Sequence, residues 1–237
     1  PFIERLTAQN IEIVSTGGTA KAIDDLGISV IEISDFTGFP EIMGGRVKTI
    51  NPHVEGGILG LRDKHSEEAI KNNIHWIDLV VCNLYPFNET ISRNNCTLEM
   101  ALENVDIGGP TMIRSAAKNL GWVGVVVDPL DYLQVAEEIE NNNGITFNTR
   151  KDLSTKAFSY TAQYDAIIHD YLEEEKFPEK LTLTFNKDSE MRYGENPHQA
   201  ASSYKVLNNR KNNILSAKIH QGKQLSFNNI MDAVAAL

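Results

Sequence analysis

The segment IEIVSTGGTAKAI, residues 11–23, decides the fold because it joins an apolar strand to a helix through a pair of glycines. The chain contains four such β-rich runs, IEIVST (11–16), SVIEIS (29–34), IDLVVCNLY (77–85) and WVGVVVD (122–128). Helical patterns alternate with them, near 19–26, 65–73, 97–105, 110–119 and 129–142. Runs rich in Val, Ile and Leu that alternate with helices are typical of a parallel sheet covered on both faces. The sequence therefore predicts a doubly wound α/β domain.

A longer helix is predicted from Thr149 to about Glu175, because apolar side chains recur there at three- and four-residue spacings. We expect its apolar side to pack on the first domain or on a partner subunit. After EEEKFPEK (173–180) the pattern changes, since KLTLTF (180–185) and AASSYKV (200–206) alternate like strands. This change predicts a domain boundary, with a first domain over residues 1–184 and a second over 185–237.

Composition limits the function classes. The 237 residues carry 22 basic and 32 acidic side chains, and the resulting net charge of −10 makes nucleic acid an unexpected partner. No apolar run approaches the roughly 18 residues of a membrane span, so we expect no membrane association. Cys82 and Cys96 form neither a CxxC pair nor a secreted disulfide pattern, which favours a reducing compartment and predicts a cytoplasmic location.

Both ends of the sequence resemble the interior of a fold. PFIERLTAQN (1–10) has the pattern of a late part of an amphipathic helix, and NNIMDAVAAL (228–237) stops inside another helical pattern. A helix that leads into the strand at 11–16 normally has its own strand before it in a doubly wound domain. We therefore expect the sequence to be incomplete at both termini.

The stretch STGGT (15–19) follows the first strand and opens a helix. Small residues let a ligand approach the backbone, and free N–H groups of a first helical turn bind oxyanions, so phosphate is the natural ligand. An ordinary tight turn explains the two glycines equally well. The stretch matches neither GxGxxG nor GxxxxGK[ST], which argues against a dinucleotide fold or an ATPase.

DIGGPTMIRSAAKN (106–119) repeats this arrangement, with Asp106 ahead of a helix that carries Arg114 and Lys118 one turn apart. An acid at the start and a base at the end of a helix also simply complement its dipole. A functional interpretation gains support because three glycine pairs, at 17–18, 44–45 and 108–109, all fall at strand or helix ends, where ligands gather in open α/β sheets.

Two further stretches carry candidate groups. In NLYPF (83–87), Asn83 and Tyr85 emerge where a strand ends, although Tyr85 is equally well explained as a half-buried aromatic residue. In GGRVKTINPH (44–53), Arg46 and Lys48 point to the same side if the segment is extended. No metal site is predicted, because the HxE of residues 53–55 lacks the PCxxC that zinc deaminases need.

Taken together, five stretches closely resemble the bifunctional AICAR transformylase/IMP cyclohydrolase family of purine biosynthesis. STGGTAKAI (15–23), DFTGFPEIMGGRVKTINPHVEGGIL (35–59), IDLVVCNLYPF (77–87) and DIGGPTMIRSAAKN (106–119) resemble its cyclohydrolase half. MRYGENPHQ (191–199), followed by GKQLSFNNIMD (222–232), resembles the opening of its transformylase half. The resemblance implies a methylglyoxal-synthase-like doubly wound sheet, followed by the partial start of an α+β, cytidine-deaminase-like domain.

The implied activity is ring closure of formyl-AICAR, a purine nucleotide precursor, to IMP with loss of water and without any cofactor. The family also formylates AICAR with 10-formyltetrahydrofolate, but it places a required Lys-His pair and its folate site beyond Leu237. We therefore expect that second activity only from a full-length protein. The family forms homodimers, so a homodimer is the expected assembly, with a small-molecule nucleotide as the ligand.

The resemblance also assigns residues. It implies catalytic groups at Lys48, Tyr85, Asp106 and Lys118, the first two at the developing oxyanion and the last two in proton transfer. It implies substrate and phosphate contacts at Ser15, Thr16, Gly17, Gly18, Thr19, Arg46, Thr49, Asn83 and Gly108. In the second domain it implies AICAR contacts at Arg192, Tyr193, His198 and Asn229.

One departure from the family and two alternative functions stay open. The family's first strand and its Ser-Asp-Lys-Thr-Gly loop, which supplies a lysine to the phosphate, do not occur in these residues. A molecule without them is expected to have weak or no cyclohydrolase activity. The alternatives are a methylglyoxal synthase and a regulatory nucleotide-binding module like those of carbamoyl-phosphate synthetases. A methylglyoxal synthase would lack RVKTINPH (46–53) and RYGENPHQ (192–199), and a regulatory module has no need for Lys48, Asp106 and Lys118 in one pocket.

Overall fold

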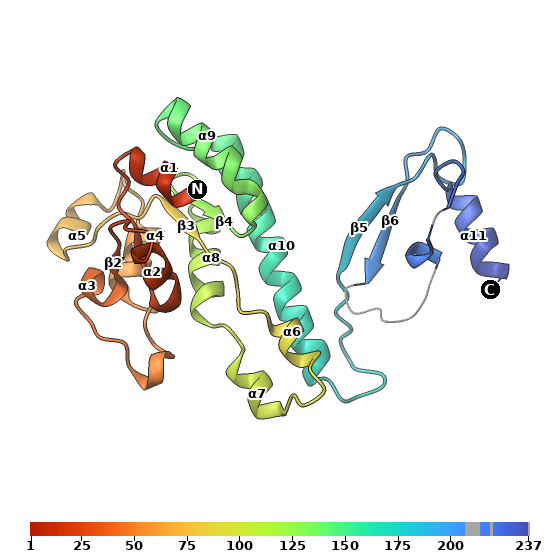
Figure 1. The fold of residues 1–237 in the computed structure, drawn as a ribbon, viewed down its shortest axis with the longest axis horizontal. Coiled ribbons are helices and arrows are strands. Elements are labelled where there is room, and N and C mark those ends of the chain that lie inside the picture. The colour runs from red at the N-terminus through yellow and green to blue at the C-terminus, as the bar shows by residue number, and fades with distance from the viewer. Residues whose placement is uncertain (207–213, 219, 237) are drawn as a thin grey trace. The chain divides into compact units, whose positions relative to one another are not determined.

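The computed structural model describes residues 1–206, 214–218 and 220–236. The chain divides into two compact units, Pro1–Tyr171 and Leu172–Leu237, which are described separately below (Figure 1). The domain boundary between residues 184 and 185 stays a prediction.

Parallel strand pairs confirm the α/β class of the first unit. β1 (Val14–Ser15) pairs with β2 (Ile31–Glu32), and β3 (Leu79–Val81) pairs with β4 (Gly124–Val126), both in parallel. Each predicted run contains one of these strands, but in the described residues they form two separate pairs, shorter than the runs. Strand propensity covers a whole apolar run, whereas pairing needs a neighbouring backbone at each residue, which only the tertiary structure provides.

Helices surround these strands. They are α1 (Phe2–Ala8), α2 (Gly17–Asp24), α3 (Ile33–Thr37), α4 (Pro52–Leu59), α5 (Ser66–Lys71), α6 (Phe87–Ile91), α7 (Leu98–Glu103), α8 (Gly108–Lys118), α9 (Tyr132–Asn142) and α10 (Phe147–Leu172), with 3-10 turns η1 (Met43–Gly45) and η2 (Pro129–Asp131). Sequence reasoning missed α3, α4 and α6. A signal existed for α4, because Asn51 precedes Pro52 and its side chain accepts a hydrogen bond from the His53 N–H at 2.8 Å.

The core of the first unit lies around β4 and α8. Val125 in β4 and Ile113, Ala116 and Ala117 in α8 are fully buried. Burying one Val or Ile side chain contributes roughly 1.5–3 kcal/mol, so this contact helps to hold α8 against the strands. The same cluster includes the α10 side chain Tyr164.

The predicted packing of the long helix on the first domain is confirmed. Figure 1 shows α10 running from α9 to α6, and its inner side chains, Leu153, Ala157 and Tyr164, are buried. At one end Thr149 donates a hydrogen bond to Glu138 of α9 at 2.5 Å, and at the other Tyr171 meets the ring of Phe87 in α6 edge-on.

The second unit begins with an antiparallel hairpin. β5 (Phe185–Glu190) pairs with β6 (Ser202–Val206), and η3 (Ile214–Ser216) and α11 (Phe227–Ala236) follow. The strand predicted at 200–206 is confirmed, but the one at 180–185 was wrong, because β5 starts only at its last residue. The polar stretch 185–190 extends because β6 pairs with it, and that long-range partner has no trace in the local pattern.

Candidate functional site

The turn between β1 and α2 has the geometry that STGGT predicts. β1 ends at Ser15, Thr16 precedes the helix in an extended conformation, and Gly17 follows with φ of 50°. The Thr16 side chain makes no capping hydrogen bond, and a β-carbon on Gly18 would meet nothing within 4 Å. Gly17, Gly18 and Thr19 are all exposed, so the first turn of α2 is accessible, which suits an anion.

Lys48 brings a positive charge to this turn. Its Nζ lies 3.9 Å from the position that a β-carbon on Gly17 would take. An ammonium group beside a helix N-terminus adds to the partial positive charge of that terminus. The predicted phosphate-binding glycine turn and the predicted catalytic lysine therefore lie side by side.

The next residue, Thr49, meets the second glycine turn. Thr49 is buried, and its Oγ1 would lie only 2.4 Å from a β-carbon on Gly108, so only glycine fits at the start of α8. Consecutive residues of one segment therefore contact the beginnings of two helices, α2 through Lys48 and α8 through Thr49. Residues from three sequence-distant motifs come together at this place.

Asp106 caps α8. Its Oδ1 accepts a hydrogen bond from the Gly109 N–H at 2.8 Å. Asp106 therefore places a negative charge at the N-terminus of α8, where it complements the helix dipole, as one interpretation of the sequence expected. Lys118 is exposed at the other end of the same helix, about 15 Å along the axis at 1.5 Å per residue. The structure thus places the two predicted proton-transfer groups at opposite ends of α8, and their shared role stays a prediction.

Asn83 and Tyr85 follow β3. The Asn83 amide Nδ2 donates to the Val127 carbonyl at 2.8 Å, which ties the chain after β3 to the chain after β4. This bond gives Asn83 a structural role in addition to its predicted nucleotide contact. Tyr85 is 49% exposed, so its side chain is accessible to a ligand.

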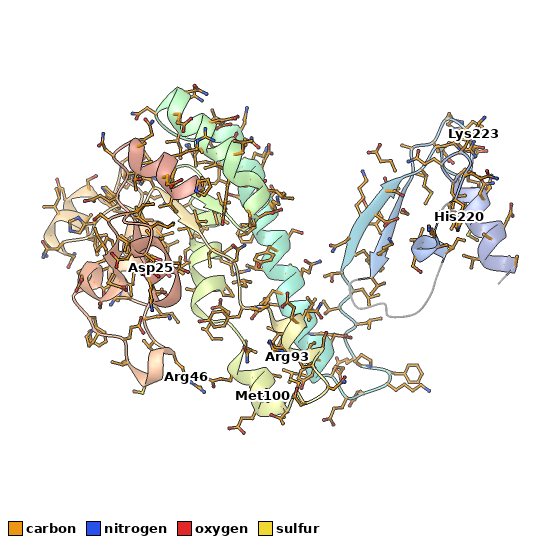
Figure 2. The ribbon with its side chains drawn as sticks, in the orientation of Figure 1. Asp25, Arg46, Arg93, Met100, His220 and Lys223 are labelled. Atoms are coloured by element: carbon orange, nitrogen blue, oxygen red, sulfur yellow. The ribbon has the colours of Figure 1, made fainter. Side chains whose placement is uncertain are left out.

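Arg46 and Lys48 point to different partners, which corrects the expectation that they share one side. Gly44 and Gly45 have φ of 67° and 87°, and they fold residues 42–47 into a tight turn in which Arg46 has a right-handed helical conformation. The condition of an extended backbone is therefore not met. Arg46 forms an exposed ion pair with Glu103 of α7. In Figure 2 the labelled Arg46 side chain extends toward the helix α7.

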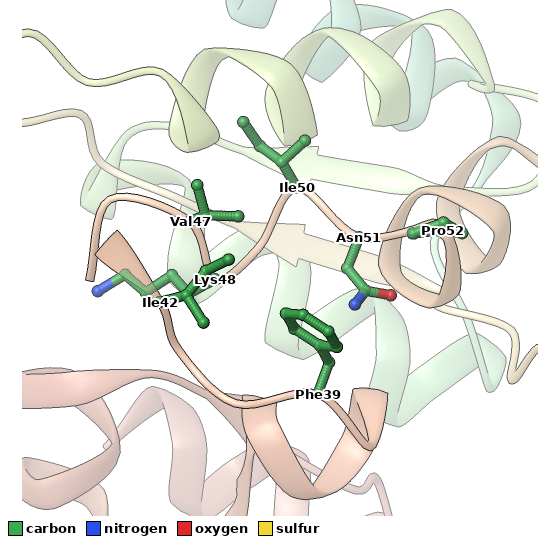
Figure 3. Close-up of a pocket in the computed structure, with 7 residues that line it drawn as sticks. All are labelled: Phe39, Ile42, Val47, Lys48, Ile50, Asn51 and Pro52. Atoms are coloured by element: carbon green, nitrogen blue, oxygen red, sulfur yellow. The ribbon is translucent and has the colours of Figure 1, made fainter. Parts of the chain in front are cut away.

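A pocket of about 310 Å³ lies beside Lys48 (Figure 3). Its wall is mostly apolar, and it is formed by Phe39, Ile42, Val47, Lys48, Ile50, Asn51 and Pro52. In Figure 3 the stem of Lys48 lines the pocket, while its ammonium group points away from Phe39 and Asn51. The pocket therefore packs against the aliphatic part of the Lys48 side chain, while the ammonium group lies outside the pocket.

The thiol of Cys82, which interacts with the Asp106 carboxylate, is uncharged near neutral pH. Burial, with a smaller contribution from the Asp106 carboxylate, raises the pKa of its thiol to about 12. A thiol with such a pKa is a poor nucleophile near neutral pH. Both cysteines are free, and Cys82 acts in packing.

In the second unit three of the four predicted AICAR residues lie together. Arg192 Nη2 donates to Asn229 Oδ1 at 3.1 Å, and the Arg192 guanidinium lies 5.3 Å from the centre of the Tyr193 ring. The Phe227 N–H donates to the Tyr193 carbonyl at 3.3 Å, which joins this segment to α11. His198 is exposed in the neighbouring turn, which the Gly194 N–H closes on the Gln199 carbonyl.

Sequence reasoning missed three residues that shape the first site. Glu103 holds Arg46, while the hydroxyls of Tyr160 and Tyr164 accept hydrogen bonds from the backbone near Tyr85 and at Asp106. The partners lie 76 and 58 positions apart in the two tyrosine contacts, so no local pattern signals them.

The described residues contain neither a metal-binding cluster nor a membrane-spanning helix. Across residues 1–206, 214–218 and 220–236, no group of three or more His, Cys, Asp or Glu side chains is arranged to hold a metal ion. In the same part of the chain, every helix is too short or too polar to cross a membrane.

The parallel α/β fold and its glycine turns at helix starts place the first unit in the class of MGS-like domains, whose family model matches residues 1–111. A second family model, described as AICARFT/IMPCHase bienzyme, matches residues 116–237, just over half of the chain. The chain belongs to this bienzyme family.

Relatives over the whole chain agree with this assignment. A bifunctional purine biosynthesis protein PurH of Listeria monocytogenes serotype 4b (strain CLIP80459) is 52% identical over 242 residues, which cover 100% of this chain and 48% of the relative. PurH of Bacillus cereus (strain AH187) is 51% identical, with 100% and 47% covered. The chain thus spans about half the length of these relatives. The crystal structure of ForH matches with a TM-score of 0.66 at 34% identity, over 72% of this chain and 88% of that one.

Proposed function

We propose that this chain carries an IMP cyclohydrolase site, which closes the ring of formyl-AICAR to give IMP and water. One observation carries the proposal: the consecutive residues Lys48 and Thr49 lie against the starts of two helices. Lys48 lies beside Gly17 of α2, and Thr49 lies beside Gly108 of α8. Such a place offers helix N–H groups, hydroxyls and an ammonium group to a nucleotide phosphate.

The chemistry needs few protein groups. The carboxamide nitrogen of the substrate attacks the neighbouring formyl carbon, a C–N bond forms, and the formyl oxygen leaves as water with two protons from nitrogen. Because both reacting groups belong to one molecule, the protein has to orient them, stabilise the oxyanion and move protons. Lys48 and Tyr85 are the proposed oxyanion contacts, and Asp106 and Lys118 the proposed proton carriers.

Several phosphate and nucleotide contacts belong to the same proposal. The Lys48 ammonium beside Gly17 supports a phosphate contact as well as an oxyanion role. Ser15, Thr16 and Thr19 would add hydroxyl donors, and Gly18 leaves room for the ligand. Arg46 would reach the nucleotide only by leaving Glu103, and Asn83 would have to keep or exchange its bond to Val127.

The second unit is proposed to begin an AICAR site. The contacts among Arg192, Tyr193 and Asn229 support it, and His198 lies in the next turn. In the full-length protein this site would formylate AICAR with 10-formyltetrahydrofolate. A cytoplasmic location, which the cysteine pattern favours, and a homodimer, which the family resemblance implies, complete the proposal.

An absorbance assay of IMP formation from formyl-AICAR with the full-length protein tests the cyclohydrolase proposal. Loss of an electrostatic contact at the reacting centre costs about 10²–10³-fold in kcat, and we expect a loss of that size for Lys48→Gln. The matched control is Lys21→Gln, because Lys21 is an exposed cation of α2 on which no predicted contact depends, and it should stay within about twofold.

The result that overturns the proposal is near wild-type turnover in Lys48→Ala or Asp106→Ala. A wild-type protein that binds IMP but forms none from formyl-AICAR would instead identify a nucleotide-binding module.

A further inference from the structure

Two tyrosines of α10 hold the backbone of the segments that carry Tyr85 and Asp106. The Leu84 N–H donates to the Tyr160 hydroxyl at 3.1 Å, and the Asp106 N–H donates to the Tyr164 hydroxyl at 2.9 Å. Leu84 directly precedes Tyr85. One helix therefore contacts both segments through the same kind of group.

Neither N–H group has a partner in a helix or strand ladder. The described β3 strand ends at Val81, before Leu84, and α8 begins at Gly108, after Asp106. Part-buried N–H groups need an acceptor, and here two side-chain hydroxyls supply it. Burial raises the pKa of both phenols, so the hydroxyls stay protonated through the neutral range.

Tyr164 links the two segments to each other. Its hydroxyl also donates to the Asn104 carbonyl at 3.3 Å, and its ring meets Phe87 at 6.3 Å with an interplanar angle of 70°. Phe87 lies two positions after Tyr85 and is buried, as Leu84 is on the other side. The exposed Tyr85 is thus flanked by two anchored residues.

We propose that Tyr160 and Tyr164 are positioning residues for ring closure, which set the places of Tyr85 and Asp106 through the backbone hydrogen bonds of Leu84 and Asp106. This inference rests on the proposed function. The hydroxyls bind peptide N–H groups, so their effect on the reaction passes through the side chains that these segments carry. Small displacements of reacting groups cost rate, because catalysis depends on their alignment.

The test is steady-state kinetics of Tyr160→Phe and Tyr164→Phe in the full-length protein, with formyl-AICAR as substrate. Each substitution keeps the ring and removes the hydroxyl, which in Tyr164 also ends the bond to the Asn104 carbonyl. We expect kcat to fall about tenfold while KM changes less than about threefold. Tyr171→Phe is the control, because Tyr171 lies on the same helix and its hydroxyl bonds to Cys96 instead. It should keep the wild-type kcat.

A double-substitution cycle separates positioning from general destabilisation. If Tyr164 acts through Asp106, adding Tyr164→Phe to Asp106→Asn protein should lower kcat by less than about twofold. If Tyr160 acts through Tyr85, adding Tyr160→Phe to Tyr85→Phe protein should likewise lower kcat by less than about twofold. A merely structural role would give the same loss in both backgrounds. Hydrogen exchange at the Leu84 and Asp106 amides should also become faster in the respective Tyr variants.

The possible failures are distinct. A wild-type protein without IMP formation overturns the proposed function, and the positioning role with it. If the wild type is active, three results overturn the positioning role alone. These are an unchanged kcat in both Tyr variants, equal losses of kcat in the paired backgrounds, and unchanged hydrogen exchange at both amides.

Discussion

The hydroxyl of Thr49 occupies the space beside Gly108 so closely that a β-carbon there would lie 2.4 Å from its Oγ1. Thr49 is buried, so it cannot turn away into solvent. The contact fixes the start of α8 against the segment that carries Lys48, and it makes glycine a steric requirement at position 108.

Gly108→Ala should therefore damage the site more than the fold. Overpacking at such a contact costs about 1–3 kcal/mol, and its relief requires a shift of Thr49 or of α8. We expect kcat/KM for IMP formation to fall at least about tenfold. Gly121→Ala is the control, since its β-carbon would meet nothing within 4 Å. Wild-type kinetics in Gly108→Ala would show that this contact does not shape the site.

Substitutions of Arg46 and of its ion-pair partner Glu103 should affect KM differently. Both side chains are exposed, so Glu103→Gln should change the free energy of unfolding by less than about 1 kcal/mol. If Arg46 contacts the nucleotide, Arg46→Ala raises KM about tenfold, whereas Glu103→Gln leaves KM unchanged or lowers it by freeing Arg46. Glu99→Gln, on the same helix, controls for net charge. A rise of KM in Glu103→Gln equal to that in Arg46→Ala would mean that the pair acts structurally.

Cys82 should resist alkylation in the folded protein. Because burial, with a further contribution from Asp106, raises its pKa from 9.0 to about 12, its thiolate fraction at pH 8 is about 10³-fold below that of a free thiol. We expect iodoacetamide to modify Cys82 in Cys96→Ser protein correspondingly slowly. Labelling at the rate of a free thiol would contradict the buried, neutral state.

The same shift predicts the pH dependence of stability. The folded state keeps the proton between pH 9 and about 12 while the unfolded state loses it, so the contribution of Cys82 is complete below pH 9 and is lost as the pH rises toward 12. The free energy of unfolding, measured with urea, should fall over this range in the wild type and fall less in Cys82→Ala.

Arg150 should be a large single contributor to stability. Its guanidinium donates to the carbonyls of Leu120 at 2.8 Å, of Gly121 at 3.0 Å and of Ile145. Arg150→Ala leaves these carbonyls without their charged donor, and we expect a loss of about 2–4 kcal/mol in urea unfolding. Lys151→Ala, at the exposed neighbouring position, should change stability by less than about 0.5 kcal/mol. Equal effects of the two substitutions would contradict this role.

The sequence by itself determined the elements whose signals are local. The apolar run before STGGT predicted β1 and α2, and the spacing of Leu153, Ala157 and Tyr164 predicted α10 and its buried side. Alternation of strands and helices predicted the α/β class, because hydrophobic periodicity reflects the faces that each element buries.

Only the tertiary structure decided which distant groups meet. It turned Arg46 toward Glu103, put Thr49 against Gly108, and gave the N–H groups of Leu84 and Asp106 to tyrosines of α10. The physical reason is that a pattern fixes which face of an element is buried, whereas its partner is chosen by packing among segments far apart in the chain.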